Sequence, residues 1–341
     1  MDQSINNKPI LSFCISTYNR ADKIFKLIND VLKYKGDNIE VIVSDNCSTD
    51  DTILELSKIQ DDRFRFFVNS PNIGAISNYM KAISEGKGEY VFFSTDKDSI
   101  SASGIYELIN FFSNHTYIVA GYSKLDVCQK AKEIIFNQGI DSLSNLAYLS
   151  HHPTGYFFKN ERLKELDVLK NYTDFEKVGV FPFEFIIAEL SMQGKTAMVE
   201  LPLFYMETME EVKNVKSFSY SGAKNNLYFF PDQRFVMSKK YIKHLLSLKL
   251  SNIEKKTMIR KIFQYGLSSV TLGYKLMLEN KSVCDHYGIE TEKIGVIKIL
   301  MNDLNFSRKF IFNSGSPSFF LRIIICLEVH CEYIFKKLKH K

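Results

Sequence analysis

Residues 89–100 read EYVFFSTDKDSI, an apolar run that stops abruptly at two acids, Asp96 and Asp98. Aromatic and β-branched side chains without charge are typical of a buried β-strand. Two carboxylates so close together repel each other unless a cation or another polar group lies between them. The stretch therefore predicts a buried strand whose carboxyl end reaches the rim of a crevice, where water, a metal or a ligand can satisfy the acids.

Strand-like and helix-like segments alternate before this stretch. Short β-rich runs, ILSFCIS, IEVIVSD and FRFFVN, begin at residues 10, 39 and 64. The first segment between them repeats its apolar residues at the spacing of one helix face, at Ile24, Leu27, Ile28, Val31 and Leu32. Repeated alternation of this kind predicts an α/β fold, with a mostly parallel sheet covered by helices on both faces.

Three of the predicted strands end in polar clusters, at residues 16–20, 44–52 and 94–98. The carboxyl ends of parallel strands lie along one edge of a sheet, which is where ligands bind in such folds. Asp50 and Asp51 are explained as helix caps before TILEL. For Asp96 and Asp98 the cap explanation is weaker, because two carboxylates so close repel each other, and a hard divalent cation that bridges diphosphate oxygens would satisfy them.

These segments, in this order and spacing, resemble glycosyltransferase family 2 of the GT-A type over residues 8–210. The resemblance rests on ISTYNR, VIVSDNCSTDDT and NSPNIGAISNYMKAISEGKGEYVFFSTDKD. It implies a GT-A-like, Rossmann-type catalytic domain in residues 1–230. It also implies an inverting transfer from a UDP- or dTDP-sugar to a hydroxyl of a glycan acceptor. The expected acceptor is an undecaprenyl-diphosphate-linked intermediate of a bacterial capsule or O-antigen.

The resemblance also implies roles for individual residues. Asp96 is expected to face the ribose and the metal, and Asp98 to be the principal ligand of Mn²⁺ or Mg²⁺. Lys97 separates these acids where a third acid is commoner, so fewer carboxylates would surround the metal. The expected nucleotide-sugar contacts are Thr17, Tyr18, Asn19, Asp45, Asn72, Gly74, Thr154 and Gly155, with Asp45 accepting the imide N–H of the base.

The resemblance further implies a catalytic base at the start of a helix downstream of the two acids. Glu184, in VGVFPFEFIIAELSMQGK, occupies that place, although Phe185 stands where the family has an aspartate. A glutamate in the first helical turn is also favourable for the helix dipole alone. The alternatives are Asp174, Glu176 and Glu189.

Two adjacent histidines, His151 and His152, precede Thr154. No further ligand pattern near them indicates a metal site. They are expected either to contact the acceptor or to be ordinary surface residues.

Residues 231–341 differ from the rest in charge and in pattern. From Asp232 onward there are 20 Lys and Arg against 9 Asp and Glu, a net charge of +11, whereas residues 1–231 carry 24 against 30, a net charge of −6. The segments beyond Phe230 predict helices without strands. The last helix carries an apolar stripe on Phe320, Ile323, Ile324, Leu327, Cys331, Ile334, Phe335 and Leu338.

That stripe is too short to span a bilayer, which needs about 20 apolar residues. It is expected to dock on the helical region, to form an oligomer interface or to lie on an anionic membrane, and the basic balance favours the membrane. Nucleic acid is not expected as a partner, because no recognition motif is present and the N-terminal part is acidic.

The start of the chain has neither a basic segment nor an apolar one, so we expect no signal peptide and a cytoplasmic protein, peripheral at the inner face of the cell membrane. The six cysteines form no CxxC pair, which favours free thiols.

Two other functions stay open. A nucleotidyltransferase would show a glycine-rich basic loop where STYNRAD stands, and an inactive nucleotide- or glycan-binding module is compatible with Lys97 and Phe185.

Overall fold

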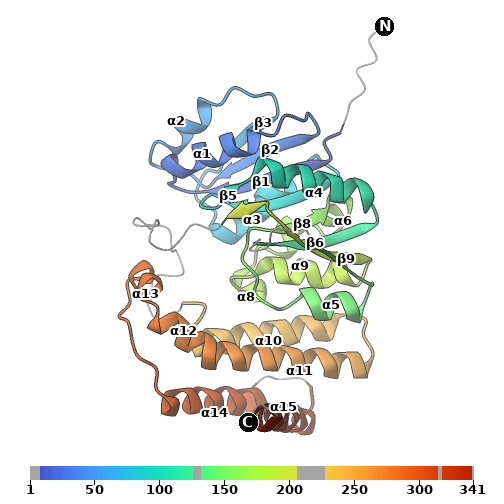
Figure 1. Ribbon diagram of the computed structural model, residues 1–341, viewed down its shortest axis with the longest axis vertical. Coiled ribbons are helices and arrows are strands. Elements are labelled where there is room, and N and C mark those ends of the chain that lie inside the picture. Colours follow the sequence, from blue (N-terminus) through green and yellow to red (C-terminus); the bar gives the residue numbers. More distant parts are fainter. Residues whose placement is uncertain (1–7, 126–131, 206–226, 314–316, 340–341) are drawn as a thin grey trace. The chain divides into compact units, whose positions relative to one another are not determined.

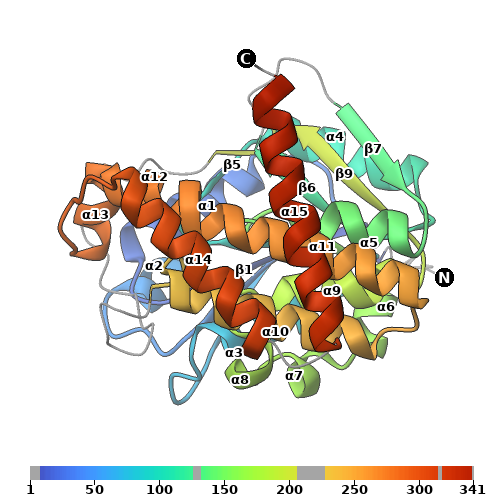
Figure 2. The same cartoon turned by 90° about the horizontal axis from the view of Figure 1, so that it is seen from below.

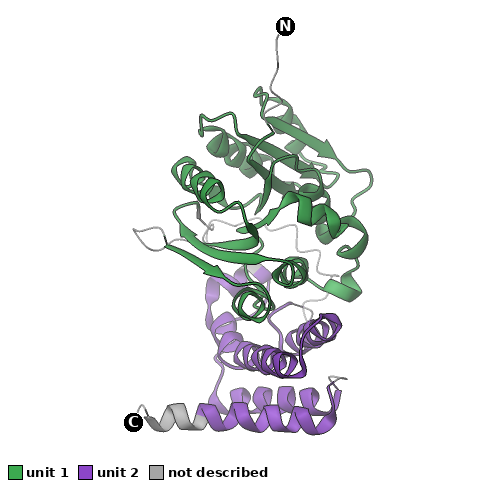
Figure 3. Ribbon diagram, turned by 90° about the vertical axis from the view of Figure 1, so that its right-hand side faces the viewer, with its two compact units in different colours: residues 1–208 green, residues 209–341 purple. Residues whose placement is uncertain are grey.

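The computed structural model describes residues 8–125, 132–205, 227–313 and 317–339. The chain divides into two compact units, residues 1–208 and residues 209–341 (Figure 1; Figure 3). Residues 206–226, where one unit gives way to the other, lie outside the described residues. The expected boundary between residues 230 and 231 stays a prediction.

A mixed sheet forms the centre of the first unit, and its described strands follow the order β3-β2-β1-β4-β8-β6-β9-β7. Strands β1 to β4 pair in parallel, as do β6 and β9, whereas β8 and β7 run antiparallel to their neighbours. A small second sheet pairs β5 with β10. The strands are β1 Leu11–Thr17, β2 Ile39–Asp45, β3 Phe64–Val68, β4 Tyr90–Thr95, β5 Ser99–Ile100, β6 Ile118–Leu125, β7 Lys132–Phe136, β8 Tyr156–Lys159, β9 Lys195–Leu201 and β10 Phe204–Tyr205.

Helices cover both faces of the large sheet. Successive residues of a strand point to opposite faces, and Phe92 and Phe93 of β4 show the two packings. Phe92 joins the core that α1 and α4 close, whereas Phe93 lies 4.9 Å from the ring of Tyr79 on α3. The predicted α/β class is therefore confirmed. The helices of this unit are α1 Ala21–Leu32, α2 Thr52–Ser57, α3 Ala75–Ser84, α4 Ala102–Asn114, α5 Ile140–Leu146, α6 Asn160–Glu165, α7 Val168–Asn171, α8 Phe175–Val178 and α9 Pro182–Ser191.

The described residues of the second unit form helices and connecting loops without strands, as predicted. Two long helices, α10 and α11, pack together, and α14 and α15 form a further layer across them (Figure 2). Phe263 of α11 anchors this packing, with its ring 4.4 Å from that of Phe310 and 5.7 Å from that of Phe306, both on α14. The helices are α10 Pro231–Ser247, α11 Asn252–Ser268, the π-helical turn η2 Ser269–Gly273, α12 Tyr274–Glu279, α13 Lys281–Tyr287, α14 Val296–Asn313 and α15 Phe319–Lys339.

The last helix, α15, corrects one expectation. Docking and an exposed apolar stripe were expected as alternatives, but α15 combines them. Ile325 and Val329 are fully buried against neighbouring helices, while Phe320, Ile324 and Leu327 of the predicted stripe stay exposed. Of the other stripe residues, Ile323 is partly buried and Cys331 is exposed, and the side chains of Ile334, Phe335 and Leu338 lie outside the described part of the chain. No helix in the described ranges combines the length and the apolar character needed to cross a bilayer.

Candidate active site

The predicted strand ends meet as expected. Thr17, the last residue of β1, stands opposite Asp45, the last residue of β2, and Ser16 stands opposite Thr95 at the end of β4. The hydroxyl of Thr17 donates a 2.8 Å hydrogen bond to Asp96 Oδ2. Residues 79 positions apart thus form one polar edge, because parallel pairing aligns the carboxyl ends of β1, β2 and β4.

Asp45 is fully buried and held by a residue that the sequence did not single out. Ser48 donates to it twice, from its backbone N–H at 2.9 Å and from its hydroxyl. Ser48 Oγ also accepts the N–H of Asn19 at 2.8 Å, and Asn19 Oδ1 accepts the N–H of Thr49 at 2.8 Å. The loops after β1 and β2 therefore form one hydrogen-bonded unit around the Asp45 carboxylate, with Asn19 in the left-handed region at φ 53°.

The turn before α3 brings Asn72 and Gly74 to the same edge. Asn72 Oδ1 accepts the N–H of Gly74 at 2.9 Å and the side-chain amide of Asn46 at 2.8 Å. Gly74 has φ 81°, which L side chains rarely adopt, and nothing lies within 4 Å of where a Cβ would stand. Glycine is therefore required here by the backbone and not by a close neighbour. Asn46, which links this turn to β2, was another residue that the sequence reasoning missed.

Asp96 lies among groups that favour its charged form, but burial works against them. Burial raises the pKa of Asp96 above its ordinary value, while the charge of Arg20 and hydrogen bonds from Thr17 and the Tyr18 backbone lower it. The net direction is upward. A carboxyl in such a place is short of positive charge, which a bound cation would supply.

Asp98 was expected at a solvated rim, but the structure places it beneath the rim. Only 3% of its surface is exposed. Its Oδ2 accepts the Thr95 hydroxyl at 2.6 Å and the Thr154 hydroxyl. Thr154, which precedes β8, lies 56 positions later in the chain, so a segment distant in sequence packs against this carboxylate. His152 Nδ1 is 3.8 Å from the same oxygen.

Thr154 and Gly155 support this buried acid. Thr154 is fully buried, and its hydroxyl oxygen also accepts the backbone N–H of Thr95 at 2.9 Å. Gly155, at φ 116°, donates its N–H to the Phe93 carbonyl at 3.1 Å, which ties β4 to the start of β8. Their expected contact with the donor sugar stays a prediction.

Glu184 lies in the first turn of α9, as expected, but it points into the protein. Its side chain is fully buried and accepts three hydrogen bonds, from the N–H of Leu149 at 2.9 Å, the N–H of His151 at 2.8 Å and the Tyr156 hydroxyl at 2.8 Å. The carboxylate therefore anchors the loop before β8. Its role as the base stays a prediction, and that role requires the carboxylate to exchange one of these donors for an acceptor hydroxyl.

The alternative bases have other surroundings. Asp174 and Glu176 are exposed, and Asp174 Oδ1 accepts the N–H of Glu176 at 2.9 Å as the cap of α8. Glu189 is partly buried, on the last turns of α9.

The two histidines are not ordinary surface residues. His151 stacks on the Tyr122 ring at 4.4 Å, and burial lowers its pKa. Burial also lowers the pKa of His152, against the charge of Asp98. His152 Nδ1 accepts the N–H of Thr154 at 3.3 Å. Contact with an acceptor stays open as the other interpretation of the pair.

The residues at this edge could supply some, but not all, of the ligands of a hard cation. Asp96 and Asp98 supply carboxylate oxygens from one short segment, the kind of donor that Mg²⁺ and Mn²⁺ prefer. The described residues contain no group of three or more His, Cys, Asp or Glu placed to hold a metal alone. A cation here would need phosphate oxygens or water as its remaining ligands, which is usual for Mg²⁺ at nucleotide sites.

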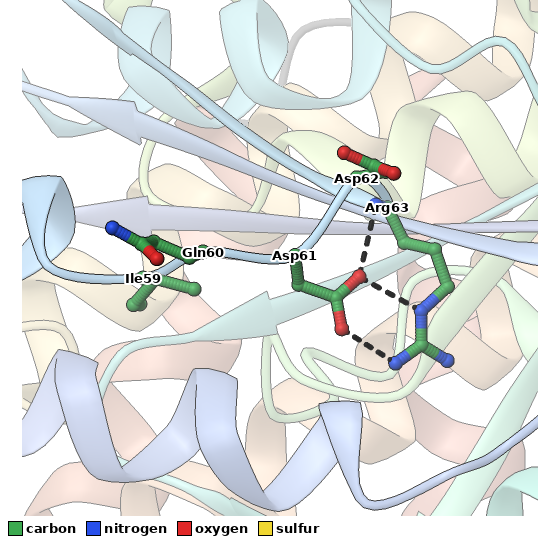
Figure 4. Close-up of a pocket in the computed structure, with 5 residues that line it drawn as sticks. All are labelled: Ile59, Gln60, Asp61, Asp62 and Arg63. Atoms are coloured by element: carbon green, nitrogen blue, oxygen red, sulfur yellow. Dashed lines mark hydrogen bonds and ion pairs between the residues drawn. The ribbon is translucent and has the colours of Figure 1, made fainter.

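A hollow on the surface of the first unit lies away from the strand ends that carry the candidate site. It is lined by residues 59–63, which precede β3 and so lie at the amino end of the parallel strands (Figure 4). Arg63 and Asp61 pair there, with Nε to Oδ1 at 2.9 Å and Nη2 to Oδ2 at 2.8 Å. These charges satisfy each other. The hollow therefore offers no ligand chemistry comparable to that at the carboxyl ends.

Comparison with known proteins locates the family signal on these elements. The family model described as "Glycosyl transferase family 2" matches residues 12–175. Abequosyltransferase RfbV of Salmonella typhimurium is 34% identical over 108 residues, 28% of this chain and 32% of that protein. UDP-Glc:alpha-D-GlcNAc-diphosphoundecaprenol beta-1,3-glucosyltransferase WfaP of Escherichia coli is 32% identical over 102 residues, 30% of this chain and 41% of that protein. The matches thus span about a third to two fifths of these relatives.

A solved structure extends the likeness to the fold of most of the chain. The crystal structure of residues 1–349 of S. aureus TarS matches with a TM-score of 0.56 at 15% identity, over 88% of this chain and 90% of that one. At this identity the match shows the fold alone, and it confirms the predicted GT-A-like class with a helical region after it. The family model covers the strand ends that carry Thr17, Asp45, Asp96 and Asp98, so we conclude that residues 12–175 of this chain are similar to glycosyltransferase family 2.

Proposed function

We propose that this chain transfers a sugar, with inversion, from a nucleotide-diphosphate donor to a hydroxyl of a glycan acceptor. The observation that carries the proposal is the joined polar edge. Thr17, from β1, hydrogen-bonds Asp96, after β4, and Asp45 ends the strand beside β1. The family model covers the same residues. A binding edge built from three strand ends suits an extended ligand such as a nucleotide sugar.

The nucleotide would lie along the loops after β1 and β2. Tyr18 and Asn19 would line the base, and Asp45 would accept the imide N–H of a uracil or thymine, so the expected donor is a UDP- or dTDP-sugar. Ser48 fixes the carboxylate for this contact through two hydrogen bonds. Asn72 and Gly74 would border the nucleotide from the turn before α3, where Gly74 leaves the backbone open to a close ligand.

Asp98 and Asp96 would hold Mg²⁺ or Mn²⁺ together with the donor diphosphate. Such a cation supplies charge neutralisation on the leaving diphosphate. The chain's own residues place the two carboxylates: Thr95 and Thr154 orient Asp98, and Thr17 orients Asp96. Thr154 and Gly155, at the start of β8, would border the donor sugar.

The acceptor proton needs a base, and we propose Glu184 for it. Its carboxylate would release a loop N–H, from Leu149 or His151, when an acceptor hydroxyl arrives. Those N–H groups belong to the loop that carries His152, which stands beside Asp98. Acceptor entry and the ordering of this loop would then be coupled through one side chain.

For the acceptor we propose a lipid-linked intermediate of a bacterial surface polysaccharide. One relative is named for an acceptor on diphosphoundecaprenol and another for the transfer of abequose. An undecaprenyl chain is a long hydrocarbon that stays in a bilayer. The reaction would therefore take place at the cytoplasmic face of the cell membrane, with the enzyme as a peripheral protein.

The test begins with a thermal-shift screen of nucleotide sugars in Mn²⁺, followed by reaction of the stabilising donor with lipid-linked acceptors. We expect a chelator-sensitive product whose new glycosidic bond has the anomeric configuration opposite to that of the donor, as judged by NMR. Donor binding without transfer or hydrolysis would favour an inactive binding module. Release of pyrophosphate from a nucleoside triphosphate would favour a nucleotidyltransferase.

A further inference from the structure

Helix α14 turns an apolar face to solvent. A helix on the surface of a globular unit normally hides its apolar stripe and exposes its polar one. Here Phe306 and Phe310 are buried, yet apolar side chains recur on the other side at helical spacing and are largely exposed. They are Ile297 at 76% exposure, Leu300 at 56%, Met301 at 55%, Leu304 at 69% and Phe312 at 64%.

Helix α15 extends this surface. Its exposed residues Phe320, Ile324 and Leu327 repeat every three or four positions, and α15 lies beside α14 on the same layer (Figure 2). The ring of Phe312 on α14 is 5.6 Å from that of Phe319 on α15, which joins the two helices. We define the α14/α15 face as Val296, Ile297, Leu300, Met301, Leu304, Phe312, Phe319, Phe320, Ile324 and Leu327. A contiguous apolar surface of this kind marks an interaction site.

The acidic side chains of α14 and α15 are engaged by neighbouring helices. Asp303 accepts from His330 at 2.9 Å, Glu328 from Lys256 at 2.7 Å, and Glu332 pairs with Arg260. These are all the acids among the described residues of α14 and α15 whose side chains are placed, and each is engaged by a neighbouring helix. Arg308, one helical turn beyond Leu304, is exposed. The α14/α15 face therefore offers apolar groups and a cation but no anion.

We propose that the α14/α15 face binds an anionic lipid bilayer, with both helices lying flat in the headgroup region. A second copy of the chain fits less well, because a twofold contact between two such faces would bring no carboxylate to either Arg308. An anionic headgroup supplies that partner, and acyl chains accept the apolar side chains. In the sequence, Lys336, Lys337, Lys339 and Lys341 follow directly and add basic charge near such a surface.

The proposal goes beyond the transfer reaction, and its test needs no substrate. Full-length protein is sedimented with phosphatidylcholine vesicles that either contain or lack phosphatidylglycerol. Leu300→Glu is compared with Leu54→Glu, a matched control on α2 of the first unit, because the two leucines are exposed by 56% and 57%. We expect Leu300→Glu to weaken vesicle binding about tenfold and Leu54→Glu to leave it unchanged.

Charge is tested separately. Arg308→Gln is expected to weaken binding to the anionic vesicles about fivefold and to leave binding to neutral vesicles unchanged. Circular-dichroism melting of each variant checks that the fold persists, and Leu304→Gln provides a second, milder change on the same face. Three results would overturn the proposal: wild-type protein that ignores both vesicles, equal losses in Leu300→Glu and Leu54→Glu, or a wild-type dimer that Leu300→Glu dissociates while vesicle binding stays absent.

Discussion

The two units of this chain depart from the usual distribution of polar and apolar side chains in opposite ways. In the first unit, carboxylates are buried: Asp45, Asp98 and Glu184 are at most 3% exposed, and hydroxyl or N–H groups hold each of them. In the second unit, apolar side chains are exposed, with Ile297 at 76% and Phe320 at 75%. Both arrangements oppose the usual distribution of residue types.

Each departure is consistent with a partner outside the chain, and the kind of partner differs. Buried acids are costly unless they are paired, so a cluster of them at the strand ends is consistent with a cation and a phosphate-bearing ligand. Exposed apolar helices lose the burial that would stabilise them, so the α14/α15 face is consistent with a lipid surface. The first unit would thus hold the donor, and the second would hold the membrane that carries the acceptor.

The largest effect is expected at the buried acids. Asp98→Asn should lower transfer by about three orders of magnitude, because a neutral amide cannot balance the charge of a cation at the diphosphate. The fold should persist, since the Asn carbonyl can still accept from Thr95 or Thr154. Initial rates of sugar transfer measure the effect.

Asp61→Asn is the matched control for this change, because Asp61 is an acid of the same unit that pairs with Arg63 at the other end of the sheet. It should keep the wild-type rate. If Asp98→Asn kept that rate in a chelator-sensitive enzyme, the metal role of Asp98 would be wrong.

The next effect concerns Glu184. Glu184→Gln should keep donor affinity and lower turnover about 100-fold, since the base acts on the acceptor and not on the diphosphate. It should also reduce the free energy of unfolding by about 1–3 kcal/mol, because an amide cannot accept all three buried donors. Steady-state kinetics and urea unfolding measure the two effects.

Tyr156→Phe separates the two roles of Glu184. It removes one donor to the carboxylate and leaves the carboxylate itself in place. We expect lower stability with turnover largely retained. A loss of turnover as deep as that of Glu184→Gln would mean that Glu184 only positions the loop, and the base would then be sought among Asp174, Glu176 and Glu189.

Much of the first unit could be predicted because its signals are local or periodic. The apolar spacing of residues 24–32 predicted α1, and the strand ends predicted that Thr17, Asp45 and Asp96 would meet. The burial of Asp98 could not be predicted, because it depends on Thr154, 56 positions later in the chain, whose hydroxyl donates to the carboxylate. The burial of Glu184 could not be predicted either, because its three hydrogen-bond donors lie 28–35 positions earlier in the chain.

The supporting residues were missed for a related reason. Ser48 and Asn46 lie in the polar cluster after β2, where the sequence shows many hydroxyls and amides but not which of them faces Asp45 or Asn72. In the second unit, periodicity found the stripe of α15, but it could not show that the opposite side of the helix is also apolar enough to dock. Ile325 and Val329 lie on that side.

A smaller effect distinguishes the two sides of α15. Ile325→Ala should reduce the free energy of unfolding by about 2 kcal/mol or more, since Ile325 is fully buried. Leu327→Ala, at 60% exposure two positions later, should change it by less than about 0.5 kcal/mol. For the same reason, a chain that ends at Pro317 should melt at a lower temperature. Equal effects of the two alanine substitutions in urea unfolding would contradict the docked arrangement.

The smallest effect depends on pH. Burial lowers the pKa of His330, but hydrogen bonds with Asp303 and the Cys326 carbonyl outweigh it and raise the pKa overall. A raised pKa in the folded state stabilises the fold below the unfolded value of about 6.5, and that stabilisation is lost as pH rises through the folded value. The stability difference between wild type and Asp303→Asn should therefore be larger at about pH 6 than at about pH 8.5. A difference that does not change with pH would exclude this pair as its source.

The central claim, that the strand ends of the first unit bind a nucleotide diphosphate, is tested most directly by calorimetric titration of UDP and dTDP in Mn²⁺. Wild type and Asp61→Asn should bind one of them equally well, and Asp45→Asn should bind it about tenfold more weakly, because the base loses a charged hydrogen-bond acceptor. Melting curves establish that Asp45→Asn remains folded. Absence of binding to the wild-type chain, or equal affinity of Asp45→Asn and wild type, would contradict the account.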